Sequence, residues 1–224
     1  MLVLLIGVAM SDFVKKCFFL GVFGFCISIL SLFKLNFMLG SHKLFFSGVN
    51  FILPLIGAFF SLPVTAFLIS SLFVFKLLMG FSIVTMGLPT FIAACSWAVS
   101  SKILDFLLHV ILPLSCMILF IMHPVAGQAF AYSFYWLIPI ALYALGNKST
   151  FFRALSATFL AHAVGSIIWL YTVPMTSAQW LSLIPVVAVE RLVMTCGMVV
   201  LYYGLSWFLN LEFIQTFCIV RIRR

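Results

Sequence analysis

The apolar stretch AHAVGSIIWLYTVPM, residues 161–175, carries side chains that lipid contact alone does not require. On one helix, His162, Ser166 and Trp169 stand at positions i, i+4 and i+7, which share a face. An imidazole and a hydroxyl can hydrogen-bond, and an indole can stack on a flat ring. Because a polar side chain inside a bilayer is costly, His162 needs a partner. That partner is either a group on another helix or a ligand or transferable proton, and the sequence leaves both open.

A second candidate is Glu190, which lies well inside the last apolar run, beside Arg191. Adjacent residues on a helix point about 100° apart, so we expect these two side chains not to face each other. One interpretation is an ion pair with another helix that fixes the packing. The other is that one of the two contacts a polar ligand near the outer side of the membrane.

Aromatic residues gather in two further segments, HPVAGQAFAYSFYW (residues 123–136) and TSAQW (residues 176–180). If these segments meet the His162 face, aromatic rings and a few hydrogen-bonding groups line the outer half of the bundle. Such a lining suits a small, flat, polar heterocycle. A belt of aromatic side chains at the membrane surface, including Trp169 and Tyr171, is the alternative. The candidate ligand contacts are His162, Trp169, Trp180, Glu190, Tyr132, Tyr135 and Trp136.

An intramembrane enzyme would need a different set of residues. His109, His123 and His162 with Glu190 could form a metal or acid–base site. The chain has no HExxH, GxSxG or phosphate-loop motif, and only four acidic residues. The six cysteines are scattered without a CxxC pair, which is typical of small buried apolar residues. We therefore expect neither an enzyme nor a bound metal or cofactor.

The elements that position these residues are predicted from composition. Hydrophobic residues make up 66% of the 224 residues and charged residues 7%, whereas about a quarter of a soluble domain is charged. The long continuous apolar runs favour an all-α transmembrane bundle over a barrel, whose strands alternate. The net charge of +8 comes from single Lys and Arg residues beside apolar runs, which indicates membrane anchors and not nucleic-acid binding.

Turn and charge signals divide the chain into as many as eight apolar runs. Some are shorter than the roughly 20 residues of a full crossing, so we expect six to eight spans in a single membrane domain over residues 1–224. Residues 1–14 form an N-terminal segment, and residues 210–224 a basic cytoplasmic tail. The expected runs are 15–36, 49–60, 64–79, 83–99, 104–122, 130–146, 154–173 and 180–209.

Charge placement predicts the orientation. With an internal N-terminus and eight spans, Lys102, Lys148, Arg153 and the RIRR tail also fall inside, and the uncharged loop 174–179 falls outside. Lys34 and Lys43 are outside in this arrangement, which still obeys the positive-inside rule. Both termini are therefore predicted to be cytoplasmic, and the protein to be a multi-pass protein of a bacterial cytoplasmic membrane.

The C-terminal half resembles a known family. RALSATFLAHAVGSIIWLY, a short loop and WLSLIPVVAVERLVMTCGMVVLYYGL resemble the last two helices of the substrate-binding S components of energy-coupling factor vitamin transporters. PLIGAFFSLPVTAFLISSLF resembles the second and third helices of that family. The chain departs from the family in having more than six apolar runs. It also lacks the glycine-rich continuation after MGLPTF (residues 86–91) that a biotin transporter would carry, so no particular ligand is implied.

The resemblance implies an uptake subunit that captures a vitamin-like molecule from outside. A separate ATPase would power it through a membrane scaffold subunit. Such scaffolds usually dock on small residues, and Gly21, Gly24 and Ser28 are the candidates, although small residues also serve internal packing. The alternatives are a ligand-free assembly protein and, less favoured, the intramembrane enzyme.

Overall fold

A computed structural model of the chain describes residues 21, 24, 34–35, 46–47, 49–78, 80, 87–146 and 149–209. Most of the predicted first span, the segment 1–14, the tail 210–224, Ser28 and Lys148 lie outside these residues. The chain forms two units, Met1–Ile52 with Val200–Arg224, and Leu53–Val199, and each is considered by itself.

The first unit contains the only two β-strands among the described elements. Strands β1 (Lys34–Leu35) and β2 (Phe46–Ser47) pair antiparallel, with Lys34 opposite Ser47. The sequence predicted only a polar break here, because two-residue strands are too short to show an alternating pattern. The unit also holds the short helix α2 (Val49–Ile52) and the end of α10 (Ser177–Leu209). Gly21 and Gly24 are helical and exposed.

The second unit begins with a hinged pair of apolar helices. A 3-10 turn, η1 (Leu53–Leu55), leads into α3 (Ile56–Phe59), and α4 (Leu62–Leu78) follows. Phe60 between them is extended, with φ −118° and ψ 158°, so the hinge predicted at residues 61–63 is confirmed with Leu62 already helical. A Cβ on Gly57 would lie 1.8 Å from the Ala94 carbonyl oxygen, so only glycine permits this approach of α3 to α5.

Helix α5 (Leu88–Ala98) is shorter than the predicted run 83–99. Gly87 has φ +91°, a left-handed conformation that glycine adopts readily, and Pro89 occupies the first helical turn. These two residues set the start of the helix, at the Gly87-Leu88-Pro89 step predicted for the start of the run, and residues 83–86 lie outside the described residues.

Three helical segments follow one another without a break, namely α6 (Lys102–Phe106), a π-helical turn η3 (Leu107–Ile111) and α7 (Leu112–Met122). The Leu112 N–H bonds to the Leu107 carbonyl, five residues back. The wide turn comes just before Pro113, which has no N–H to continue the α-helical pattern. A 3-10 helix, η4 (Ala126–Trp136), and α8 (Leu137–Ala144) return along α7.

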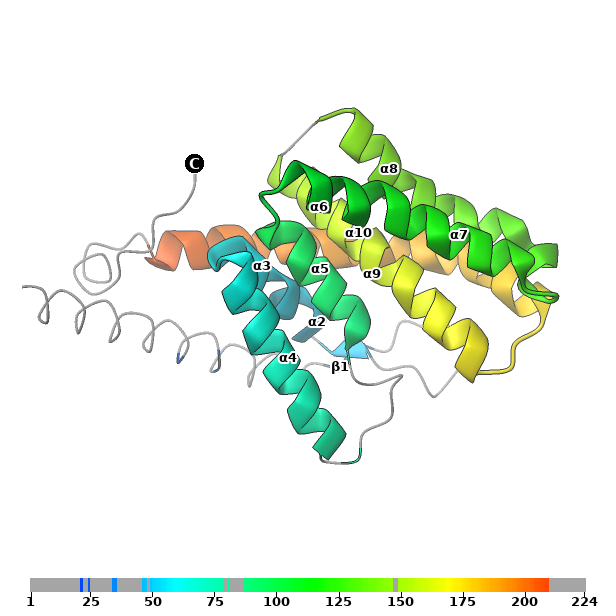
Figure 1. Cartoon of the computed structure of the whole chain (residues 1–224), viewed down its shortest axis with the longest axis horizontal. Helices are drawn as coiled ribbons and strands as arrows, with labels where there is room; N and C mark the ends of the chain where they lie inside the picture. Colours follow the sequence, from blue (N-terminus) through cyan, green and yellow to red (C-terminus); the bar gives the residue numbers. More distant parts are fainter. Residues whose placement is uncertain are drawn as a thin grey trace, which may run out of the picture. The chain divides into compact units, whose positions relative to one another are not determined.

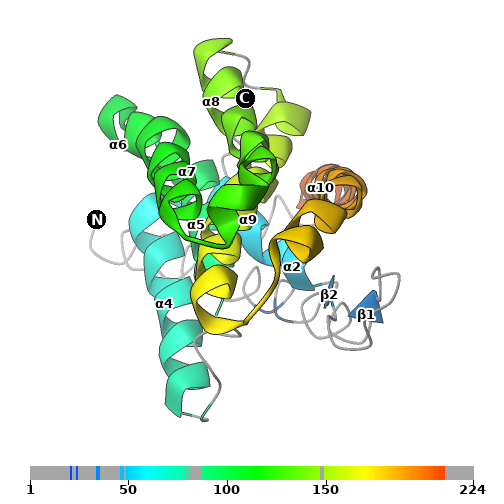
Figure 2. The same cartoon turned by 90° about the vertical axis from the view of Figure 1, so that its right-hand side faces the viewer.

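Helix α9 (Thr150–Thr172) lies at the centre of the second unit and packs against α5, α7 and α8. Figures 1 and 2 show these helices side by side. The Ser149 hydroxyl caps its start by accepting the Phe152 N–H at 3.4 Å. Gly165 faces α5, since a Cβ there would lie 3.4 Å from Cγ of Pro89.

The start of α10 is fixed by a reciprocal cap between Thr176 and Gln179. The Thr176 N–H donates to Oε1 of Gln179 at 2.8 Å, and the Gln179 N–H donates to the Thr176 hydroxyl at 3.3 Å. This is a capping box, which satisfies two backbone donors at a helix start. The helix therefore begins at Ser177, three residues before the predicted boundary, and continues through Pro185.

Three helical stretches are long and apolar enough to cross a membrane, judged by length and composition: Lys102–Met122, Thr150–Thr172 and Ser177–Phe208. Three shorter apolar helices accompany them among the described residues. Their outer surfaces carry large apolar side chains such as Phe67, which is 71% exposed, and Leu78, which is 77% exposed. The predicted helical architecture with membrane-compatible helices is confirmed to this extent.

Candidate ligand-binding site

Four helical elements of the second unit contribute rings to one buried group of aromatic side chains. Phe120 of α7 lies 5.2 Å from Trp180 of α10 and 5.3 Å from Trp136 of η4, edge-on to both rings. Tyr132 of η4 stacks on Phe120 at 5.5 Å and meets Trp180 at 5.0 Å. All four side chains are almost fully buried. Side chains of α7, η4 and α10 thus meet at this point.

Helix α9 supplies the other side of the group. The His162 ring lies 5.4 Å from the Tyr132 ring and 6.3 Å from Phe159, measured between centroids. Tyr135 stacks on Phe159 at 5.6 Å, and its hydroxyl donates to the Ile184 carbonyl of α10 at 2.7 Å. Together these seven side chains form what we call the aromatic cluster: Phe120, Tyr132, Tyr135, Trp136, Phe159, His162 and Trp180.

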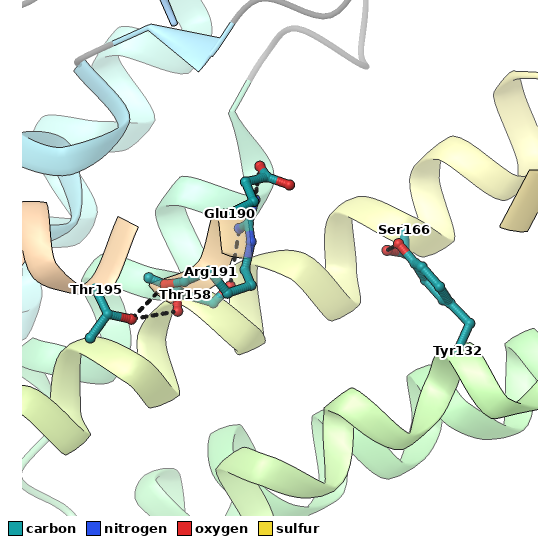
Figure 3. Close-up of polar contacts among 6 residues, drawn as sticks. All are labelled: Tyr132, Thr158, Ser166, Glu190, Arg191 and Thr195. Carbon is teal, nitrogen blue, oxygen red and sulfur yellow. Dashed lines mark hydrogen bonds and ion pairs between the residues drawn. The ribbon is translucent and has the colours of Figure 1, made fainter. Parts of the chain in front are cut away.

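The shared face of α9 predicted for His162 and Ser166 is present. The Tyr132 hydroxyl lies 3.4 Å from Oγ of Ser166 (Figure 3). Tyr132 therefore contacts both polar residues of that face, through its ring and through its hydroxyl. A single residue of η4 connects the two turns of α9.

Three ring nitrogens of the aromatic cluster are buried without a hydrogen-bond partner among the described residues: Nε1 of Trp136, Nε1 of Trp180 and Nε2 of His162. Buried polar atoms are paired in the large majority of cases, because leaving one unpaired costs about 1–3 kcal/mol. Hence the interhelical hydrogen bond considered for His162 is not made by Nε2 with any described residue.

Glu190 and Arg191 form an ion pair with each other, and the expectation that they do not face each other was wrong (Figure 3). Long side chains can bend across the 100° between adjacent residues, which the backbone direction alone does not show. The pair lies within α10, so the predicted ion pair between helices is also corrected. Arg191 instead reaches α9 by donating to the Thr158 carbonyl at 3.4 Å.

Two threonines extend this contact into a polar node between α9 and α10. The Thr195 hydroxyl donates to the Arg191 carbonyl at 2.7 Å, and it lies 3.4 Å from the Thr158 hydroxyl (Figure 3). The node is separate from the aromatic cluster in its contacts.

Trp169 does not join the aromatic cluster by a ring contact. Its indole N–H donates to Sδ of Met175 at 3.1 Å, in the turn between α9 and α10. Nearby, Tyr171 is exposed and meets the His123 ring edge-on at 5.4 Å. An exposed tyrosine at a helix end agrees with the belt interpretation. Of the seven candidate contacts, five are in the aromatic cluster, whereas Trp169 and Glu190 are not.

The histidines proposed for an enzyme have different neighbours. Nδ1 of His109 lies 2.9 Å from the Asp105 carboxylate, one turn away, and the His109 ring stacks on Tyr143. Nδ1 of His123 accepts the Val125 N–H at 3.3 Å. Within the described part of the chain, no group of three or more His, Cys, Asp or Glu side chains could hold a metal ion.

Sequence reasoning missed Phe120 and Phe159, which complete the aromatic cluster. Phe159 stands three residues before His162, a spacing that already indicates a shared face, but one of 27 phenylalanines carries little signal. It also missed the contact of the Ser177 hydroxyl with the Val125 carbonyl, at 2.8 Å, which joins the starts of α10 and η4.

Comparison with known proteins adds no relative, since no family model, curated protein or solved structure matches the chain.

Proposed function

We propose that this chain is a multi-pass membrane protein that binds a small planar molecule at the aromatic cluster and acts as the uptake subunit of a transporter. The observation that carries the proposal is the set of three unpaired ring nitrogens among buried aromatic rings. Aromatic faces stack on a planar ring, and the nitrogens offer hydrogen bonds that no described residue uses. A ligand with polar atoms would remove the cost of leaving them unpaired.

The contact between Arg153 and Trp97 supports the proposed orientation. Arg153, at the start of α9, donates to the Trp97 carbonyl near the end of α5 at 2.7 Å. The end of α5, the start of α9 and Lys102 at the start of α6 therefore belong to one side, and this basic side is cytoplasmic by the positive-inside rule. The uncharged turn between α9 and α10 is then external, next to Trp169 and Trp180.

The connected helices η4 and α8 support an additional crossing beyond the three long helices. Eleven residues of 3-10 helix and eight of α-helix follow one another. The backbone of η4 is non-helical at Ala129, and the helical residues after it extend about 26 Å at rises of about 2.0 and 1.5 Å per residue, close to a hydrocarbon core of about 30 Å. Together with the shorter apolar helices and the predicted first span, this supports the proposed six to eight spans, and an even number of spans would leave both termini on the cytoplasmic side.

The proposed transport role is that of an S component. Its support is the resemblance of α9 and α10 to that family and the absence of a phosphate-loop motif from the sequence, so ATP hydrolysis would belong to a separate subunit. A scaffold subunit would dock at Gly21, Gly24 and Ser28. The exposure of Gly21 and Gly24 agrees with such a surface.

A second candidate is a ligand-free assembly protein, which the close packing of the aromatic cluster favours. Tyr132 and Trp180 have ring centroids 5.0 Å apart, within the range of directly packed aromatic pairs. A planar ligand would therefore have to displace a ring as it enters. Trp180, near the start of α10 and next to the external turn, is the ring placed to move.

Native mass spectrometry of the gently purified full chain distinguishes the two candidates. We expect a bound molecule of about 200–500 Da, a size that such a site can enclose. His162→Ala should lower its occupancy and leave membrane insertion and the folded yield unchanged. A protein that carries nothing, even after incubation with a panel of vitamins, would refute the uptake role and favour the assembly protein.

A further inference from the structure

The chemistry of the unpaired nitrogens restricts the class of ligand. Trp136 and Trp180 are 0% and 1% exposed, and neither indole N–H has a partner among the described residues. An indole N–H can only donate a hydrogen bond. Each of these two groups therefore needs an acceptor atom and gains nothing from a second donor.

The two indoles belong to one site although they come from different elements. Both meet the same ring, Phe120, edge-on at interplanar angles of 86° and 88°. The Tyr132 ring also contacts both, at 6.4 Å from Trp136 and 5.0 Å from Trp180. A planar molecule that enters beside Phe120 and Tyr132 as the Trp180 ring moves would meet both indoles.

The two acidic side chains that the structure describes are both paired elsewhere. Asp105 lies 2.9 Å from Nδ1 of His109, one turn away. Glu190 is paired with its neighbour Arg191, so the charge of that arginine is balanced as well. A cationic ligand at the aromatic cluster would thus meet N–H donors, with no unpaired carboxylate among the described residues to balance its charge.

The geometry points to a ligand that is a planar molecule rich in hydrogen-bond acceptors, neutral or anionic, carrying carbonyl or carboxylate oxygens that accept the Trp136 and Trp180 N–H groups. This inference rests on the proposed function, since it names the substrate class of the same site. Trp136 and Trp180 are then specificity-determining residues, because an analogue that lacks the acceptors leaves both donors buried and unpaired.

The test compares two probes built on one ring. Nicotinate carries carboxylate acceptors, and 3-(aminomethyl)pyridine carries a cationic donor at the same ring position. Binding to the purified full chain is measured by isothermal titration calorimetry in detergent. We expect nicotinate to bind at least tenfold more tightly than the amine. Equal or tighter binding of 3-(aminomethyl)pyridine would overturn the inference.

Isosteric replacement isolates the N–H groups themselves. Replacing Trp136 or Trp180 by 3-benzothienylalanine keeps the shape of the ring and removes the donor. Each replacement should weaken nicotinate binding about tenfold, whereas the same replacement at Trp207, which is 69% exposed, should not change it. Unchanged affinity in both variants would mean that water, and not the ligand, satisfies the indoles, and would overturn the inference.

Native mass spectrometry of the same samples separates the two possible failures. If the wild-type chain carries a molecule whose composition lacks acceptor oxygens or nitrogens, the inference is wrong and the proposed function stands. If the chain carries no molecule and binds neither a probe nor any member of the vitamin panel, the proposed function itself is refuted. If neither probe binds but an acceptor-rich molecule is carried, loss of that molecule in the two isosteric variants supports the inference, and its retention overturns it.

Discussion

Arg153 and Trp97 make two contacts at once, a hydrogen bond from Nη2 to the Trp97 carbonyl at 2.7 Å and a guanidinium 4.7 Å above the centroid of the Trp97 ring. The first contact satisfies a carbonyl in the last turn of α5, where intrahelical donors run out. The second is within the range of a cation–π interaction. A single side chain therefore joins the end of α5 to the start of α9, two helices that pack along each other.

Arg153→Gln should consequently destabilise the second unit. A hydrogen bond from a charged group and a cation–π contact together support an expected loss of about 1–3 kcal/mol in the free energy of unfolding. Thermal unfolding in detergent, followed by tryptophan fluorescence, measures the loss. Lys102→Gln removes an exposed cation at the start of α6 and should leave the melting temperature unchanged. Equal melting temperatures for both variants would contradict the role assigned to Arg153.

Gly57→Ala should be among the most disruptive single changes in the chain. The new Cβ would lie 1.8 Å from the Ala94 oxygen and 3.1 Å from the Ala98 nitrogen, both backbone atoms that cannot rotate away. Helices α3 and α5 would have to separate, and we expect a loss of folded protein in detergent, measured by size-exclusion chromatography.

Gly204→Ala is the matched control for that change. A Cβ at Gly204 would meet nothing within 4 Å among the described residues, and the residue lies within α10. Alanine at an unobstructed helical position is more stable than glycine by about 0.5–1 kcal/mol. The two substitutions should therefore act in opposite directions, and a Gly57→Ala variant as stable as the wild type would show that α3 and α5 do not pack this closely.

The Thr176–Gln179 capping box predicts a selective effect at the start of α10. Gln179→Ala removes the acceptor of the Thr176 N–H and should cost about 0.5–1.5 kcal/mol, the usual net value of a hydrogen bond. Gln179→Glu retains an acceptor oxygen at this position and should preserve stability. Hydrogen exchange of the amides at the start of α10 reports the difference, and equal protection in both variants would argue against the cap.

The sequence predicted the parts of the fold that follow from composition, from turn signals and from residue spacing. The hinge at residues 61–63 and the shared face of His162 and Ser166 come from local patterns, and both are present. Helix starts were less well predicted. The Thr176–Gln179 pair shifts the start of α10 by capping, which apolar content does not reveal.

The candidate site was predictable only in part, for a physical reason. Tyr132, Tyr135, Trp136, His162 and Trp180 could be named because each stands out by type within an apolar run. Which of them touch depends on how separate helices pack, and Trp169 packs against the buried core with its N–H on Met175, without a described ring contact to the aromatic cluster. The Glu190–Arg191 pair shows the same limit, since backbone direction did not predict where two long side chains end.

Variants of Glu190 and Arg191 can separate the destabilisation caused by an unpaired buried charge from the stabilisation that the ion pair itself provides. Arg191→Met leaves the Glu190 carboxylate without its described partner in an apolar setting and should cost about 3–5 kcal/mol. Adding Glu190→Gln removes that charge and should restore most of the stability, because a buried ion pair is often close to neutral relative to uncharged side chains of similar size. The single and double variants are compared by thermal unfolding in detergent. If the double variant is as unstable as Arg191→Met alone, the loss comes from the other contacts of Arg191, among them that with the Thr158 carbonyl, and not from the uncompensated charge.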